Sequence, residues 1–138
     1  MRFPFWSSSN SRTAGHSSPI RGTSRERYLA LGDSFTIGTG TTPDRSFPAV
    51  LVARWRARGR EVALTNPSAN GYATEDLIAH ELPLARVVRP TLVTVLVGAN
   101  DIVRASGEAR YRAQLRRLHE ELRAAGVPAG ATFALPQP

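Results

Sequence analysis

Residues 91–97 read Thr-Leu-Val-Thr-Val-Leu-Val and form the most regular apolar stretch of the chain. The β-branched residues and the nearly continuous hydrophobicity are typical of a strand that is covered on both faces in a parallel sheet. Such a strand needs neighbouring strands at its edges and helices on both faces. This stretch therefore constrains the fold more strongly than any other part of the sequence.

Shorter apolar runs and helical segments alternate around this stretch. Three further strands are predicted, at 28–31, 61–65 and 131–135. Helical spacing of apolar residues predicts three helices, at 47–59, 74–82 and 108–125. Ser46 and Thr74 are expected to cap the first two. The alternation of strand and helix predicts an α/β protein with a parallel sheet and right-handed crossovers.

Each of the first three predicted strands ends in a small, polar loop that contains glycine. The loops are Gly32-Asp33-Ser34, residues 66–71 and residues 98–101. The carboxyl ends of parallel strands meet at one edge of a sheet, so the loops are expected to lie together. Ser34 can supply a nucleophilic hydroxyl, Gly71 a backbone N–H and Asn100 a side-chain amide. This combination suits acyl transfer, because the tetrahedral intermediate carries an oxyanion that needs hydrogen-bond donors.

In these loops and in their order, the chain resembles the SGNH (GDSL-type) hydrolases, a family of esterases, lipases and acetylhydrolases. Residues 32–40 match the first block of that family, Gly71 the glycine of the second, and residues 98–101 the Gly-x-Asn-Asp of the third. The resemblance covers residues 28 to about 135. It implies a flavodoxin-like three-layer α/β/α sandwich with strand order 2-1-3-4-5, and small-molecule esters as substrates.

The resemblance also implies roles for individual residues. Ser34 would attack the ester carbonyl, and the oxyanion hole would consist of the N–H groups of Ser34 and Gly71 with the Asn100 amide. Asp33 and Asp101 are expected to order their turns through hydrogen bonds. No cofactor or metal is expected: the chain has no cysteine, its histidines are not spaced as metal ligands, and it has neither a phosphate-binding Gly-x-Gly-x-x-Gly nor a Walker lysine.

One block of the family does not occur in the sequence. SGNH hydrolases carry Asp-x-x-His near the C-terminus, and its histidine is the general base. His16, His80 and His119 are poorly placed to replace it, and Asp76 precedes His80 by four residues instead of three. The chain is therefore expected to be an N-terminal part of the family domain, with a sheet that is incomplete at the C-terminus. Little or no esterase activity and poor solubility at the exposed fourth strand are expected.

Two other functions are compatible with the same pattern. A non-catalytic module could keep the oxyanion pocket and bind an acyl group or a carbohydrate. A nucleotide-binding domain could use the same flavodoxin-like sheet. Loss of ligand affinity on Asn100→Ala without any hydrolysis would favour the binding module.

Composition limits the partners of the chain. The net charge is +7, but all 18 basic residues are arginines and are scattered over several predicted helices, so specific nucleic-acid binding is not expected. Residues 1–26 are rich in Ser, Arg, Gly and Pro and are predicted to be a disordered basic arm before a hydrolase domain at 27–138. No membrane span or signal peptide is recognised, which favours a cytoplasmic location. The oligomeric state is left open.

Overall fold

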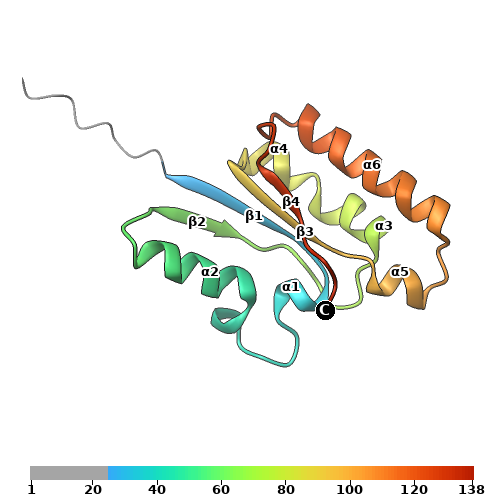
Figure 1. The fold of residues 1–138 in the computed structure, drawn as a ribbon, viewed down its shortest axis with the longest axis horizontal. Helices are drawn as coiled ribbons and strands as arrows, with labels where there is room; N and C mark the ends of the chain where they lie inside the picture. Colours follow the sequence, from blue (N-terminus) through green and yellow to red (C-terminus); the bar gives the residue numbers. More distant parts are fainter. Residues whose placement is uncertain (1–24) are drawn as a thin grey trace, which may run out of the picture.

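The computed structural model describes residues 25–138, which fold around a four-stranded parallel sheet (Figure 1). The strands are β1 (Glu26–Gly32), β2 (Val62–Thr65), β3 (Leu92–Leu96) and β4 (Thr132–Ala134). Their order is β2-β1-β3-β4, which confirms the predicted parallel α/β sheet and the predicted order of its first four strands. Most of the predicted basic arm lies outside the described residues, but β1 already includes Glu26.

Helices connect and flank the strands. They are α1 (Ser34–Ile37), α2 (Phe47–Arg56), α3 (Thr74–Asp76), α4 (Leu84–Val88), α5 (Ala99–Val103) and α6 (Glu108–Ala124). A 3-10 turn, η1 (Pro43–Arg45), precedes α2, and a π-helical turn, η2 (Leu77–Glu81), follows α3. The single helix predicted at 74–82 is thus divided. It stops before Pro83, which has no N–H to continue the helix.

Ser46 is the N-cap residue of α2 as predicted, but neither predicted cap makes the expected side-chain hydrogen bond. The Ser46 hydroxyl does not bond to the first turn of α2 and instead donates to the Pro43 carbonyl oxygen, at 2.8 Å. Thr74 lies inside α3, and the residue before the helix is Ala73. The Ala73 N–H donates to Asp76 Oδ2 at 2.9 Å, so a carboxylate in the first turn bonds back to the residue that precedes the helix.

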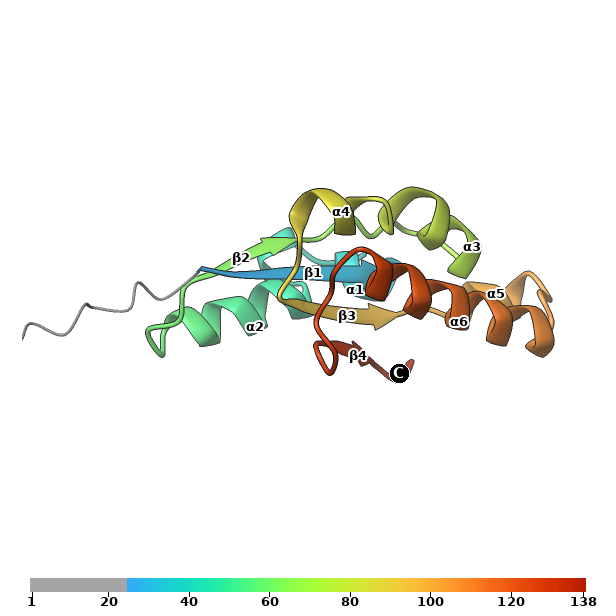
Figure 2. The same ribbon diagram turned by 90° about the horizontal axis from the view of Figure 1, so that it is seen from above.

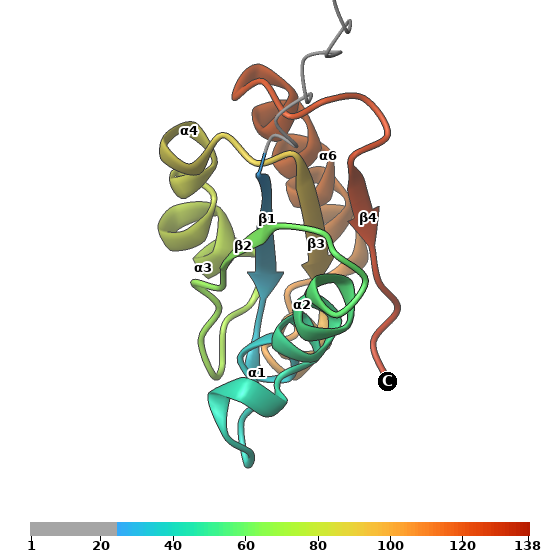
Figure 3. The same ribbon diagram turned by 90° about the vertical axis from the view of Figure 1, so that its left-hand side faces the viewer.

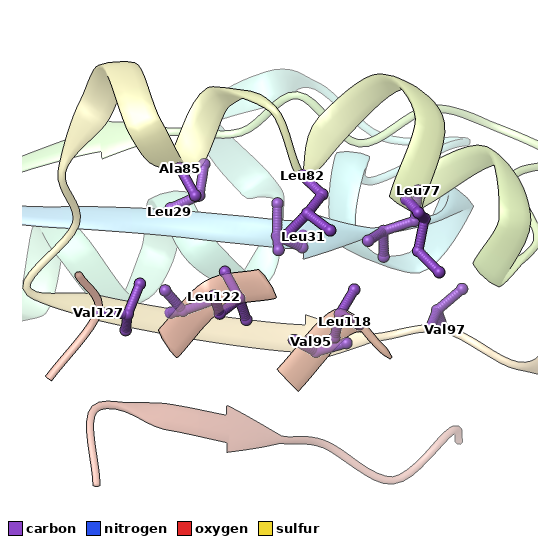
Figure 4. Packing of buried hydrophobic residues seen from close by; sticks show 12 residues of the cluster. Leu29, Leu31, Leu77, Leu82, Ala85, Val95, Val97, Leu118, Leu122 and Val127 are labelled. Atoms are coloured by element: carbon purple, nitrogen blue, oxygen red, sulfur yellow. The ribbon is translucent and has the colours of Figure 1, made fainter. Parts of the chain in front are cut away.

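The larger part of the core lies on one face of the sheet, beneath η2, α4 and α6. Figure 4 shows leucines of η2 and α6 directed toward side chains of β1 and β3. Alternate residues of β1, Leu29 and Leu31, are fully buried here, as the two-residue period of a strand requires. The cluster is completed by residues of these elements and of the segments that follow them: Leu77, Ile78, Leu82, Ala85, Val93, Val95, Val97, Leu118, Leu122 and Val127.

The opposite face is covered by α2. The intervening residues of β1, Tyr28 and Ala30, are buried against Val52 of α2 and Val62 of β2. Trp55 packs edge-on against Tyr28, with ring centroids 5.7 Å apart. Figures 2 and 3 show the sheet between α2 and the α3–α4 segment. The structure therefore confirms the three-layer α/β/α sandwich, with β1 covered on both faces.

Within residues 25–138, no helix combines the length and the hydrophobicity that a membrane crossing requires.

Candidate active site

Ser34 lies at the carboxyl end of β1, where the strand turns into α1. The preceding residue, Asp33, is completely buried, and its Oδ1 accepts the Phe35 N–H at 3.0 Å. The Asp33 carbonyl oxygen accepts the N–H groups of Thr36 and Ile37, both at 3.0 Å. Asp33 therefore accepts hydrogen bonds within the turn through both its side chain and its backbone. Ser34 itself is half-buried at the start of α1.

Gly32 is required because neighbouring atoms approach it closely. A Cβ at this position would lie 2.1 Å from Thr36 Oγ1 and 2.6 Å from the carbonyl oxygen of Leu96 on β3. The second of these atoms belongs to the backbone of the adjacent strand and cannot move independently. Any side chain at residue 32 would therefore displace the turn that carries Ser34.

Glu81 is a residue of this region that the sequence prediction did not single out. It is the last residue of η2, is fully buried, and accepts the Gly32 N–H on Oε2 at 2.9 Å. Burial raises the pKa of Glu81 to about 8, with a smaller contribution from the negative charge of Asp33, while the Gly32 hydrogen bond acts in the opposite direction. An acid on the apolar face marked by Leu77 and Ile78 was the sequence signal that could have identified it.

The second loop contributes Gly71, which has a positive φ of 81°. Within residues 25–138 its N–H donates to no acceptor, while its carbonyl oxygen accepts from Arg104 Nη2 at 2.7 Å. The loop is joined to the nucleophile turn through Asn66, whose Nδ2 donates to the Thr36 carbonyl oxygen at 2.9 Å. Asn66 also accepts hydrogen bonds from the backbone and the hydroxyl of Ser68.

The third loop follows β3 and contains both Asn100 and Asp101. Asn100 Nδ2 donates to the Tyr72 carbonyl oxygen at 2.8 Å. The buried Asp101 accepts the Thr74 N–H and the Thr74 hydroxyl on Oδ2, each at 2.9 Å. Asp101 was expected to order its own loop, and the structure shows that it joins that loop to α3. Hydrogen bonds therefore connect all three loops, and Figure 1 shows α1 and α5 at the same end of the sheet.

Two cavities open at this end. One, of about 400 Å³, contains Ser34 and extends over α1 and η1 to Asn70 of the second loop. The other, of about 460 Å³, lies beside the third loop between α5 and α6 and has largely apolar walls that include Ile102 and Tyr111. Both are large enough for part of a small organic ligand.

The histidines of the described region are not bonded to Ser34. His80 is exposed on η2, and its ring lies 5.6 Å from that of Tyr72. His119 is exposed on α6. His16 lies outside the described residues. From residue 25 onward, no group of three or more His, Asp or Glu side chains is arranged to hold a metal ion.

Known proteins with similar sequences and structures are acyl hydrolases by name. Thioesterase 1/protease 1/lysophospholipase L1 of Escherichia coli K12 is 26% identical over 108 residues, which are 78% of this chain and 50% of that protein. Arylesterase of Vibrio mimicus is 33% identical over 79 residues, 57% of this chain and 40% of that one. The chain spans about half the length of the curated relatives it matches.

Solved structures give the same result. A crystal structure of TesA matches with a TM-score of 0.71 at 25% identity. The matched region is 79% of this chain and 59% of the TesA chain. AlinE4, described as an SGNH-hydrolase family esterase, matches with a TM-score of 0.70 at 26% identity. The matched region is 83% of this chain and 61% of the AlinE4 chain. The flavodoxin-like fold expected from the resemblance is thereby confirmed.

The sequence profile of the GDSL-like lipase/acylhydrolase family matches residues 30–138 of this chain. This segment contains the nucleophile turn, the Gly71 loop and the Asn100–Asp101 loop, in the order and on the sheet edge described above. The match extends over most of the chain and accounts for each of the polar loops that end a strand. The chain therefore belongs to the GDSL-like lipase/acylhydrolase family of hydrolases.

Proposed function

We propose that this chain hydrolyses carboxylic esters, with Ser34 as the nucleophile and an oxyanion hole formed by the N–H groups of Ser34 and Gly71 and the Asn100 amide. The observation that carries the proposal is a set of unused donors on loops that hydrogen bonds connect to the turn with a free hydroxyl. Within residues 25–138, neither N–H donates to a protein acceptor, and the Ser34 hydroxyl has no hydrogen-bond partner. Buried or half-buried donors are normally satisfied, so donors left open at a sheet edge favour a ligand oxygen there.

The proposed mechanism assigns a separate task to each loop. Ser34 Oγ attacks the ester carbonyl carbon, and the carbonyl oxygen becomes an oxyanion. Asn100 uses one amide hydrogen for the Tyr72 carbonyl oxygen, which leaves the second for the oxyanion. The tie to Tyr72 fixes the amide before substrate arrives, which is the condition under which such donors lower a barrier most.

No side chain of the described residues is placed to act as the general base that accepts the Ser34 proton. Asp33 is next to Ser34, but its Oδ1 holds the Phe35 N–H, and neither His80 nor His119 contacts the Ser34 hydroxyl. Loss of the catalytic histidine costs roughly 10⁶-fold in turnover in a serine protease such as subtilisin. We therefore expect the 138-residue chain alone to turn esters over slowly.

Imidazole rescue tests this assignment. The rate of p-nitrophenyl acetate hydrolysis is measured with increasing imidazole, for the chain as printed and for Ser34→Ala. An external base that takes the Ser34 proton should raise the rate of the unmodified chain above the imidazole background, and Ser34→Ala should follow that background alone. Equal rates for both proteins at every imidazole concentration would refute the nucleophile assignment.

The absence of a base bonded to Ser34 within residues 25–138 also favours one alternative, an acyl- or carbohydrate-binding module without catalysis. The oxyanion donors would then hold the carbonyl oxygen of a bound ligand. In that case Ser34→Ala would keep the affinity for an acyl ligand such as octanoate methyl ester, Asn100→Ala would lose it, and imidazole would produce no Ser34-dependent turnover.

A further inference from the structure

The described residues contribute one charged side chain to the wall of the cleft that contains Ser34, that of Arg45 in η1. The rest of this lining combines apolar surface from Phe35 and Phe47 with the hydroxyl-bearing residues Thr39 and Thr41. Phe35 is 46% exposed, which is a large open apolar surface for a side chain next to the proposed nucleophile. The cleft therefore offers apolar contact and a single positive charge.

Arg45 is not neutralised by the protein around it. Within residues 25–138, no carboxylate lies within ion-pair distance of its guanidinium, and the ion pairs that do form use other arginines. Asp44 precedes it in η1 but does not line the cleft. A guanidinium presents a planar fork of donors that matches a carboxylate or a phosphate, so an unpaired one in a cleft wall is suited to such a group.

We propose that Arg45 determines substrate class, by pairing with an anionic group that lies close to the scissile ester. The ligand would combine an apolar chain with a carboxylate or a phosphate on the same molecule. This inference rests on the proposed role of Ser34, because Ser34 is what places the ester in this cleft. It concerns a different residue, however, and its test does not require turnover.

Arg54 provides a matched control for the charge. It is exposed on α2, lies outside the cleft, and makes no ion pair with the described residues. Arg45→Gln and Arg54→Gln therefore remove the same charge from a chain of net charge +7, one inside the cleft and one outside it. A general attraction of anions to a basic protein would be reduced equally by both.

Binding is measured by titration calorimetry at low ionic strength on the full chain with Ser34→Ala, so that no probe is consumed. Two matched pairs serve as probes: 1-octanoylglycerol 3-phosphate against 1-octanoylglycerol, and O-octanoylglycolate against its methyl ester. The anionic member of at least one pair should bind about tenfold more tightly, since a charge-assisted pair is worth roughly that factor. Arg45→Gln should remove the preference, Arg45→Lys should keep part of it, and Arg54→Gln should leave it unchanged.

The pair that shows the preference identifies the anion as phosphate or carboxylate, and either result supports the inference. Equal affinities within both pairs, or the same loss in Arg45→Gln and Arg54→Gln, would overturn it. A preference that depends on Arg45 without any imidazole-rescued turnover would leave Arg45 as a ligand-binding residue and refute only the esterase proposal. Turnover without the preference would refute only the role of Arg45.

Discussion

The loop that follows β1 and the two loops that follow β2 and β3 are held in place in different ways. The second and third loops are joined to each other by several polar contacts, which involve Asn100, Asp101 and Arg104. The nucleophile turn is joined to them through Asn66 and to the core through the buried carboxyl of Glu81. The proposed oxyanion donors therefore have redundant support, whereas the position of Ser34 depends on few contacts, one of which can change its charge.

Ionisation of Glu81 is expected to have the largest effect. The pKa of Glu81 is about 8 in the folded protein, whereas the ordinary value, which applies to the unfolded chain, is 4.5. Between these pH values the folded chain therefore keeps a proton that the unfolded chain has released. Stability from this group is fully present below pH 4.5 and is lost as the pH rises through 8. The free energy of unfolding should fall by up to about 1.4 kcal/mol per pH unit, on the order of 5 kcal/mol in total. Urea unfolding from pH 4.5 to 9 measures this slope.

Glu81→Gln separates this group from the other acids. The neutral amide can still accept the Gly32 N–H but cannot ionise, so its stability should be nearly constant over the same pH range. Glu75→Gln is the matched control, because Glu75 is an exposed residue of α3 whose side chain is 64% accessible. It should keep the slope of the unmodified chain. Equal slopes for Glu81→Gln and the unmodified chain would show that the nucleophile turn does not depend on a protonated Glu81.

Asp101→Ala is expected to have the next largest effect, on the pair of loops. The change leaves the buried Thr74 with an N–H and a hydroxyl that no longer have their acceptor. We expect a loss of about 2–3 kcal/mol in the free energy of unfolding, the usual range for buried donors without partners. Asp101→Asn keeps an acceptor and should lose less. A loss below about 0.5 kcal/mol for the alanine variant would mean that the second and third loops do not depend on this contact.

The sheet could be predicted from the sequence because its signals are local. The continuous apolar run at 91–97 and the alternation of strands with helices are enough to give a parallel sheet. Its order came from the resemblance of Gly32-Asp33-Ser34, Gly71 and residues 98–101 to a known family. The short helices α1 and α5 were not predicted, because four or five residues show no helical period.

The contacts that join the loops could not be predicted from the sequence. Thr74 has the sequence context of a helix cap, but its hydroxyl bonds to Asp101, 27 residues away. Glu81 shares the apolar face of Leu77 and Ile78, but its sequence position does not show that its carboxyl accepts the N–H of Gly32, 49 residues away. Both depend on which loops meet in space, and local preference carries no information about that. The sequence motif thus identified the candidate residues, and the structure identified the hydrogen bonds that hold their loops in place.

Arg104→Gln is expected to have the smallest effect and tests the redundancy of the second and third loops. Arg104 Nη2 donates to the Gly71 carbonyl oxygen and Nη1 pairs with Asp76, both at 2.7 Å, but the side chain is 48% exposed. Exposed ion pairs contribute at most about 1 kcal/mol, so we expect a loss of roughly 0.5–1 kcal/mol. Amide hydrogen exchange at Tyr72 should nevertheless become faster, because its N–H, which donates to the Ala69 carbonyl oxygen, belongs to the same peptide unit as the Gly71 carbonyl that loses its partner. Arg110→Gln, which breaks only the exposed pair with Glu75, is the matched control. If the Tyr72 amide exchanges at the same rate in both variants, Arg104 does not support the Gly71 loop, and the remaining contacts of Asn100 and Asp101 hold it without help.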